Sequence, residues 1–181
     1  DVIRLRDLLY GLMLRSGNDA AVAIAEYISG DVDSFAALMN QEAAAMGATR
    51  SHFVNPNGLP DENHYTCVYD MYLIFSNAVK NDTFVSIIGT TSYDVTYTDA
   101  SGEAVTHTWE NTNQYLTGNA TTPDGFQIVG GKTGTTGEAG YCLVLYSYNP
   151  SGQPIISIVF KADGKSNLYL LMNEMLQGFA I

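Results

Sequence analysis

In the first ninety residues the hydrophobic positions recur every three or four residues, which is the spacing of amphipathic helices. The first helix predicted in this way ends near Arg15. Its apolar positions are Leu5, Leu8, Leu9, Leu12 and Met13. A second helix follows Ser16-Gly17-Asn18 and stops at Gly30, a residue type that commonly ends helices. The positions that it should bury are Ala20, Ala23, Ile24, Tyr27 and Ile28.

Two further helices are predicted before the pattern changes. One of them ends at Gly47, and its apolar positions are Phe35, Leu38, Met39 and Met46. Thr66 is a candidate cap for the other, because its hydroxyl can accept a hydrogen bond from a free backbone N–H. The apolar positions of that helix are Val68, Met71, Tyr72, Phe75 and Val79. Between the two, residues 55–60 (Asn-Pro-Asn-Gly-Leu-Pro) are dense in turn-forming types and predict a structured loop.

Beyond residue 90 the residue types and turn signals become those of strands. Strands are predicted over 93–98 and 104–109, and a third over 126–133. A hairpin over 141–148 and 155–162 turns at Asn149-Pro150-Ser151-Gly152. Ser166 is a candidate cap for a last helix, which carries on one face Leu168, Leu171, Met172, Met175, Leu176 and Phe179. Helices, then strands, then a helix indicate an α+β fold in which helices pack on an antiparallel sheet.

The sequence shows neither an internal repeat nor a linker-like stretch, so we expect one domain over residues 1–181. Its helical part covers about 1–90, and its sheet part with the last helix covers about 91–181. Hydrophobic residues make up 46% of the chain and charged residues 15%, a balance that excludes disorder. No apolar run approaches the roughly 18–20 residues that cross a bilayer, and the first residues do not resemble a signal peptide.

Charge and residue usage exclude several classes of function. The net charge is -11 and the eight Lys and Arg residues are scattered, whereas nucleic-acid binding requires clustered cations. We interpret Cys67 and Cys142 as buried free thiols rather than a disulfide, because one lies in an apolar strand and the other near a helix start. The spacing of His52, His64 and His107 matches no metal-ligand pattern. We therefore expect neither a metal nor a cofactor.

The tripeptide Lys132-Thr133-Gly134 follows apolar strand residues and precedes a glycine-rich stretch. A phosphate-binding P-loop would require glycine at position 126, where the chain has Phe126, and Gly125 comes one residue too early. Lys-Thr-Gly is also an element of penicillin-recognising enzymes, which combine it with Ser-x-x-Lys and a Ser-x-Asn-type triplet. Ser16-Gly17-Asn18 fits that triplet, although the same residue types are ordinary at helix ends.

Four segments, in the right order, resemble the low-molecular-mass D-Ala-D-Ala carboxypeptidases, which are serine penicillin-binding enzymes. Leu14–Ala21 is similar to the family's Ser-Gly-Asn loop and the helix that follows it. His52–Asp61 resembles a loop typical of these enzymes, and Asn111-Thr112-Asn113 resembles their short Asn-rich element. Gly131–Cys142 is similar to their binding strand and the turn after it. The resemblance implies the β-lactamase/transpeptidase-like fold.

It also implies acyl transfer, in which a serine attacks the D-Ala-D-Ala peptide bond, the terminal D-Ala leaves, and water releases the acyl-enzyme. In that chemistry Ser16 takes part in the proton relay to the leaving amine. Asn18 donates its amide to a substrate carbonyl, and Lys132 places a fixed positive charge beside the nucleophile. Thr133 offers its hydroxyl to the terminal carboxylate, and the backbone N–H of Thr135 serves as an oxyanion donor.

The same resemblance places the substrate along the Lys132 strand like an added strand. Gly134 and its small neighbours would then let one backbone approach another. Lys165 is the candidate for a second cation, which many members place near the start of the C-terminal helix to hold the carboxylate. The implied partners are a peptidoglycan stem peptide ending in D-Ala-D-Ala and β-lactam antibiotics as inhibitors. The implied location is extracytoplasmic, and any membrane association of the parent protein is not encoded in these residues.

One element of the family pattern does not occur in the sequence. No serine is followed by lysine three residues later, so the Ser-x-x-Lys pair is missing. We therefore expect the chain to begin downstream of the nucleophile, to lack part of the sheet, and to be inactive by itself, whereas the parent protein would be active. Two alternatives stay open. A class A β-lactamase-like hydrolase would carry a Glu-x-x-Leu-Asn segment before Lys132, which is absent, and a noncatalytic cell-wall-binding relative would need no nucleophile.

Overall fold

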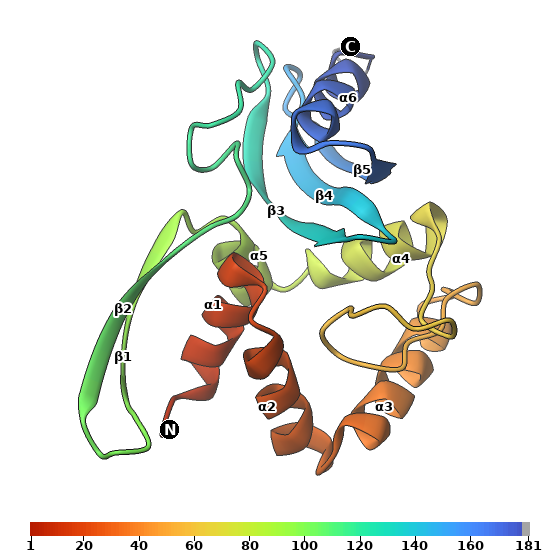
Figure 1. Cartoon of the computed structure of the whole chain (residues 1–181). Coiled ribbons are helices and arrows are strands. Elements are labelled where there is room, and N and C mark those ends of the chain that lie inside the picture. The colour runs from red at the N-terminus through yellow and green to blue at the C-terminus, as the bar shows by residue number, and fades with distance from the viewer. Residues whose placement is uncertain (179–181) are drawn as a thin grey trace.

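The computed structural model describes residues 1–178, in which helices pack against a small antiparallel sheet (Figure 1). The helices in this range are α1 (Leu5–Arg15), α2 (Asn18–Ser29), α3 (Val32–Ala45), α4 (Val68–Ala78), α5 (Asp82–Ile88) and α6 (Lys165–Gly178). The strands are β1 (Ser92–Thr98), β2 (Ala104–Glu110), β3 (Gln127–Thr136), β4 (Gly140–Tyr148) and β5 (Pro154–Ala162). The predicted α+β architecture is confirmed. No helix among the described residues has the length and apolar character needed to cross a bilayer.

The strands form two separate sheets. β3, β4 and β5 pair antiparallel in the order β3-β4-β5, while β1 and β2 form a two-stranded hairpin that extends to one side of the molecule (Figure 1). β3 is therefore an edge strand of the larger sheet. Its register sets Lys132 opposite Val144 and Gly134 opposite Cys142.

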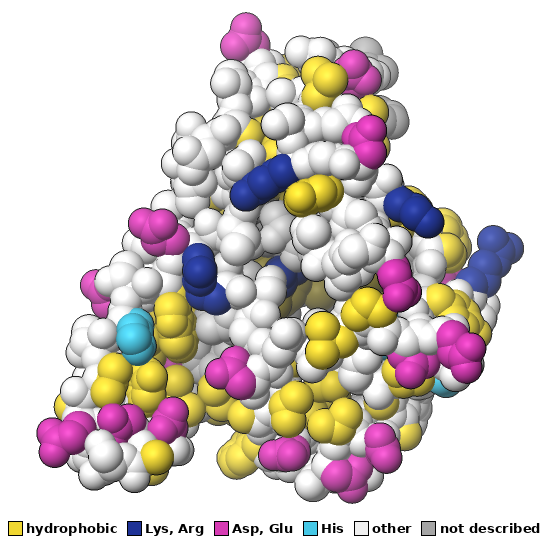
Figure 2. Space-filling model, in the orientation of Figure 1, with side chains coloured by type: hydrophobic (Ala, Val, Ile, Leu, Met, Phe, Trp, Pro, Cys, Tyr) yellow, Lys and Arg dark blue, Asp and Glu magenta, His cyan; other side chains and the backbone are white. Residues whose placement is uncertain are grey.

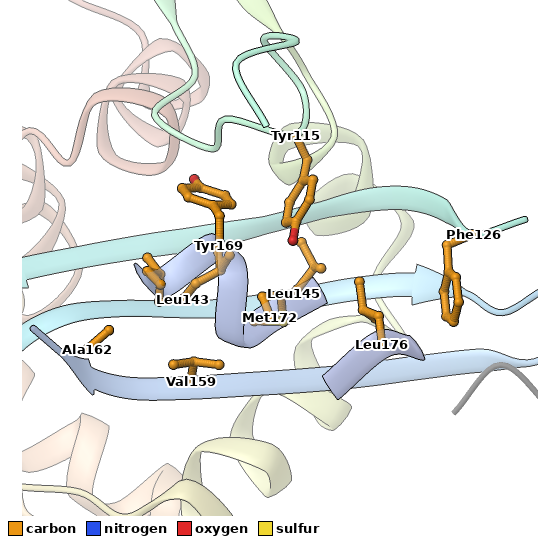
Figure 3. Packing of buried hydrophobic residues seen from close by; sticks show 10 residues of the cluster. Tyr115, Phe126, Leu143, Leu145, Val159, Ala162, Tyr169, Met172 and Leu176 are labelled. Atoms are coloured by element: carbon orange, nitrogen blue, oxygen red, sulfur yellow. The ribbon is translucent and has the colours of Figure 1, made fainter. Parts of the chain in front are cut away.

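Both faces of the larger sheet are covered by apolar side chains, because successive strand residues point to opposite sides. On one face α6 packs Met172 and Leu176 onto Leu143 and Leu145 (Figure 3), and Leu168 belongs to the same cluster. On the other face, α4 and α5 pack onto the sheet. The buried residues of that second cluster are Phe75, Ile88, Val144 and Ile158. The continuous apolar runs of β4 and β5 fit this two-sided burial.

The last turn of α5 approaches β3 backbone to backbone. A Cβ atom added at Gly130 would lie 2.5 Å from the carbonyl oxygen of Ile88, and one at Gly89 would lie 2.6 Å from that of Val129. Only glycine permits this spacing. The contact fixes where β3 enters the sheet, just before Lys132.

Several details of the predicted elements were wrong. Tyr27 and Ile28 are 75% and 53% exposed, because both lie in the last turn of α2, past the buried stripe of that helix. Leu171 is 37% exposed on α6, and Phe179 lies outside the described residues. Cys67 and Cys142 are free thiols as predicted, but each is only half-buried.

Helix ends also differ from the predictions. Cys67, not Thr66, is the N-cap of α4, and the Thr66 hydroxyl shares a 2.8 Å hydrogen bond with Ser51. α6 begins at Lys165, so Ser166 lies inside that helix. α5 was not predicted at all, since its seven residues are too few to show a period. The one sequence feature that marks the start of α5 is its N-cap, Asn81. The side-chain oxygen of Asn81 accepts hydrogen bonds from the N–H groups of residues 83 and 84.

Candidate active site

Ser16 lies at the end of α1, where the chain turns sharply into α2. Its backbone is left-handed, with φ 55° and ψ 43°, and the N–H of the next residue, Gly17, donates to the carbonyl oxygen of Gly11 at 3.2 Å. A non-glycine residue in this region costs free energy, on the order of 1–2 kcal/mol, and is held there by its surroundings. The bend directs the chain of residues 16–18 toward the sheet.

Lys132 on β3 meets this bend. Its Nζ donates hydrogen bonds to Oγ of Ser16 and, at 2.6 Å, to the carbonyl oxygen of Thr133. No carboxylate lies within ion-pair distance of it, because the described residues form a single ion pair, between Arg4 and Asp7. Burial without a counter-ion lowers the pKa of Lys132 to about 8. The site therefore holds a cation that is not neutralised by the protein.

Thr133 is bound to a segment from elsewhere in the chain. Its Oγ1 lies 2.6 Å from Oγ1 of Thr112, in the loop after β2. The backbone N–H of Thr112 donates to the carbonyl oxygen of Leu14, in the last turn of α1, at 3.2 Å. Thr112 thus connects the end of α1 to β3. Its two partners, Leu14 and Thr133, are close in sequence to Ser16 and Lys132, which form the other contact between these elements.

The two asparagines that flank Thr112 are buried and hold their own segment. Nδ2 of Asn111 donates to the carbonyl oxygen of Thr90 at 2.9 Å, and Oδ1 of Asn111 accepts from the N–H of Asn113 at 2.9 Å. Oδ1 of Asn113 accepts from the N–H of Tyr115 at 3.2 Å. Buried amides with these partners rigidify a loop. The sequence analysis matched this segment to the family's Asn-rich element but assigned its residues no role, because the groups that they bind, such as Thr90 and Thr133, lie far away along the chain.

The side chains of the remaining predicted residues form no described hydrogen bond with this centre. Gly134 and Thr135 are exposed near the end of β3, and a Cβ at Gly134 would meet nothing closer than Cys142, at 4.0 Å. Asn18 is exposed at the first position of α2. Lys165 is exposed at the start of α6, and its side chain forms no hydrogen bond or ion pair among the described residues. Hydrogen bonds join Lys132 to Ser16 and Thr133, whereas the side chains of Asn18 and Lys165 form none with these residues in the described part of the chain.

The outer edge of β3 is available for another strand. Among the described residues β3 pairs with β4 alone, so its other edge carries unpaired backbone groups near Gly134 and Thr135. Figure 2 shows the surface hollowed between the sheet and the helices α2 and α3. An extended peptide with a negative terminus suits an open strand edge beside an unpaired cation.

A helical part packed on an antiparallel sheet, with a Ser-Gly-Asn bend against a Lys-Thr-Gly strand, defines the class of serine penicillin-binding enzymes. Residues 1–164 match the peptidase S11 family, described as D-alanyl-D-alanine carboxypeptidase. The chain belongs to this family.

Individual relatives agree with this assignment. D-alanyl-D-alanine carboxypeptidase DacF of Bacillus subtilis (strain 168) is 34% identical over 173 residues, which cover 95% of this chain and 41% of that protein. The D-alanyl-D-alanine carboxypeptidase of Streptomyces sp. (strain K15) is 34% identical over 192 residues, covering 100% of this chain and 62% of that protein. The crystal structure of the Streptomyces K15 DD-transpeptidase superposes with a TM-score of 0.85 at 33% identity, covering 97% of this chain and 68% of that chain. The chain therefore spans less than two thirds of the length of these two curated relatives.

Proposed function

We propose that this chain forms the substrate-binding and proton-relay part of a serine-type D-Ala-D-Ala carboxypeptidase. Such an enzyme removes the terminal D-Ala of peptidoglycan stem peptides through an acyl-enzyme. The contact of Lys132 with Ser16, beside the open edge of β3, is the observation that carries the proposal. Family membership supplies the reaction class.

The relay follows from the donor and acceptor capacity of the two side chains. A protonated lysine only donates, so the Ser16 hydroxyl accepts from Lys132 and keeps its own proton free for another acceptor. In the proposed step Ser16 gives that proton to the leaving amine and takes one from Lys132. A pKa of about 8 for Lys132 suits this transfer near neutral pH, because a general acid works best with a pKa close to the working pH.

The substrate would extend along the outer edge of β3. Its terminal carboxylate would accept from the Thr133 hydroxyl and be attracted by the positive charge of Lys132. The N–H of Thr135 would donate to the oxyanion, Gly134 would allow the close backbone approach, and Asn18 would offer its exposed amide to a substrate carbonyl. No contact supports a share for Lys165, so its role as a second cation rests on the family pattern alone.

A serine acyl-enzyme needs a Ser-x-x-Lys pair, which these 181 residues do not contain. The proposal therefore assigns the nucleophile to residues outside this sequence. β-Lactam antibiotics would acylate the same serine, since they imitate the D-Ala-D-Ala bond. The enzyme would act outside the cytoplasmic membrane, where its peptidoglycan substrate is found.

The test compares the whole protein that carries this chain with the 181-residue chain alone. We expect the whole protein to release D-alanine from a peptide ending in D-Ala-D-Ala and to be labelled by a fluorescent penicillin. The 181-residue chain should do neither. Labelling of the short chain would contradict the placement of the nucleophile.

The same assay separates the two alternatives. Rapid hydrolysis of penicillin without peptide turnover would favour the β-lactamase-like hydrolase. Neither turnover nor labelling of the whole protein would favour a noncatalytic cell-wall-binding relative and would overturn the carboxypeptidase assignment.

A further inference from the structure

Thr112 lies in neither of the two elements that meet at the proposed site, yet it contacts both. Its Oγ1 is 2.6 Å from Oγ1 of Thr133, and its backbone N–H donates to the carbonyl oxygen of Leu14. The buried side chains of Asn111 and Asn113 hold the segment on either side. Thr112 is therefore a fixed point against which the Thr133 side chain is held.

The direction of the hydrogen bond between the two threonines follows from the proposed substrate. Each hydroxyl has one proton to donate, and a carboxylate can only accept. If Thr133 gives its proton to the substrate carboxylate, the proton between the two threonines must come from Thr112. The result is a chain from Thr112 to Thr133 to the carboxylate, in which each hydrogen bond polarises the next.

We propose that Thr112 is a positioning residue, which fixes the side-chain rotamer of Thr133 and directs its proton to the terminal carboxylate of the substrate. This inference rests on the proposed carboxypeptidase function. It gives the Asn-Thr-Asn segment a role through Thr133 rather than through direct contact with substrate. It also predicts that the effect of Thr112 depends on the substrate having a carboxylate.

The experiment uses the whole protein that carries this chain and two peptides, one ending in D-Ala-D-Ala acid and the other in the same sequence as a C-terminal amide. Thr112→Val keeps the shape of the side chain and removes the hydroxyl. We expect its kcat/KM for the acid to fall about tenfold, mainly through KM, with little change for the amide. Thr112→Ser, which restores the hydroxyl, should recover most of the loss.

Thr106→Val is the matched control, because it breaks another hydroxyl pair, between Thr96 and Thr106 at 2.9 Å, on the exposed hairpin. It should change neither peptide's kinetics. Equal losses on the acid and the amide for Thr112→Val would show a merely structural role and overturn the inference.

A second measurement needs no turnover. Three-bond NMR couplings report the χ1 rotamer of Thr133, which should be single in the unsubstituted protein and averaged in Thr112→Val. A rotamer that stays fixed in Thr112→Val would overturn the inference even if activity fell. If the unsubstituted protein turns over neither peptide, the proposed function fails, and the rotamer measurement still shows whether Thr112 fixes the side chain of Thr133.

Discussion

Nζ of Lys132 donates a hydrogen bond to Oγ of Ser16 across 116 positions of sequence. The contact joins the left-handed bend after α1 to an edge strand, so it exists only when the helical part and the sheet are packed together. It is the spatial relationship that the sequence hypothesis required of residues 16–18 and 132–134. Because Lys132 has no carboxylate partner among the described residues, its charge is available to a ligand.

The first prediction concerns the charge of Lys132. In the whole protein, Lys132→Gln should lower peptide turnover by about 10²–10³, the usual loss when an electrostatic donor leaves an active site. Lys132→Arg should not restore it, because a guanidinium keeps its proton at any working pH and cannot feed the relay through Ser16. Lys80→Gln, at an exposed lysine, is the control. Steady-state release of D-alanine measures all three, and normal turnover by Lys132→Arg would exclude the relay.

The second prediction concerns pH. Burial lowers the pKa of Lys132 from 10.5 to about 8, so between these values the unfolded chain binds more protons than the folded chain. The free energy of unfolding should therefore rise with pH in this window, because protonated Lys132 is disfavoured in the fold. In Lys132→Met this part of the rise should disappear. Denaturant unfolding at pH 7.5 and pH 10 checks it, and identical pH dependence in both proteins would contradict the lowered pKa.

The third prediction concerns the contact between α5 and β3. In Gly130→Ala the new Cβ would meet the backbone oxygen of Ile88 at 2.5 Å, and neither backbone can move without disturbing the sheet. We expect a loss of stability of about 1–3 kcal/mol, as for other overpacked positions. Gly164→Ala is the matched control, because its Cβ would meet nothing within 4 Å. The shift of the urea midpoint at constant slope measures both, and equal midpoints would show that the backbones separate freely.

Sequence reasoning found the helices and strands other than α5, and the two motifs, but not the residues that align them. The spacing of Leu and Ala positions predicted α1 and α2, and motif order predicted that Ser16 and Lys132 share a site. Neither indicates that Thr112 binds Thr133, because a hydrogen bond between distant threonines leaves no local pattern. The predicted burial of Tyr27 was wrong for a related reason. The helical period indicates which face of the helix carries a side chain, whereas its burial depends on whether another element reaches that turn.

Asp7 was another residue without a sequence signal, since one acid in a helix normally faces water. Its carboxylate is completely buried and accepts hydrogen bonds from Nε and Nη2 of Arg4, at 2.7 and 3.2 Å, and from the hydroxyl of Tyr93, at 2.6 Å. The Tyr93 ring stacks on Tyr10 with centroids 3.8 Å apart. These contacts attach the hairpin to α1, the helix that ends at Ser16.

Burial alone would raise the pKa of Asp7, but the hydrogen bonds from Arg4 and Tyr93 outweigh it and the pKa is lowered. A carboxyl whose folded pKa is below its unfolded value contributes stability above the unfolded pKa, and this contribution is lost as pH falls through the folded pKa. Tyr93→Phe keeps the stacked ring and removes one donor, so it should cost about 1–3 kcal/mol at neutral pH. Its acid unfolding should begin at a higher pH.

Tyr97→Phe is the matched control, because Tyr97 lies on the same strand and its hydroxyl has no described hydrogen-bond partner. Urea unfolding at pH 7 and circular dichroism during acid titration measure both variants. If Tyr93→Phe and Tyr97→Phe unfold alike, the Asp7 carboxylate gains nothing from Tyr93. If the cost of Tyr93→Phe, measured in urea, is the same at pH 3 as at pH 7, the hydroxyl stabilises the fold without lowering the pKa of Asp7. The lowered pKa requires a cost that shrinks as pH falls, because the hydrogen bond favours the ionised form of Asp7 over the protonated form.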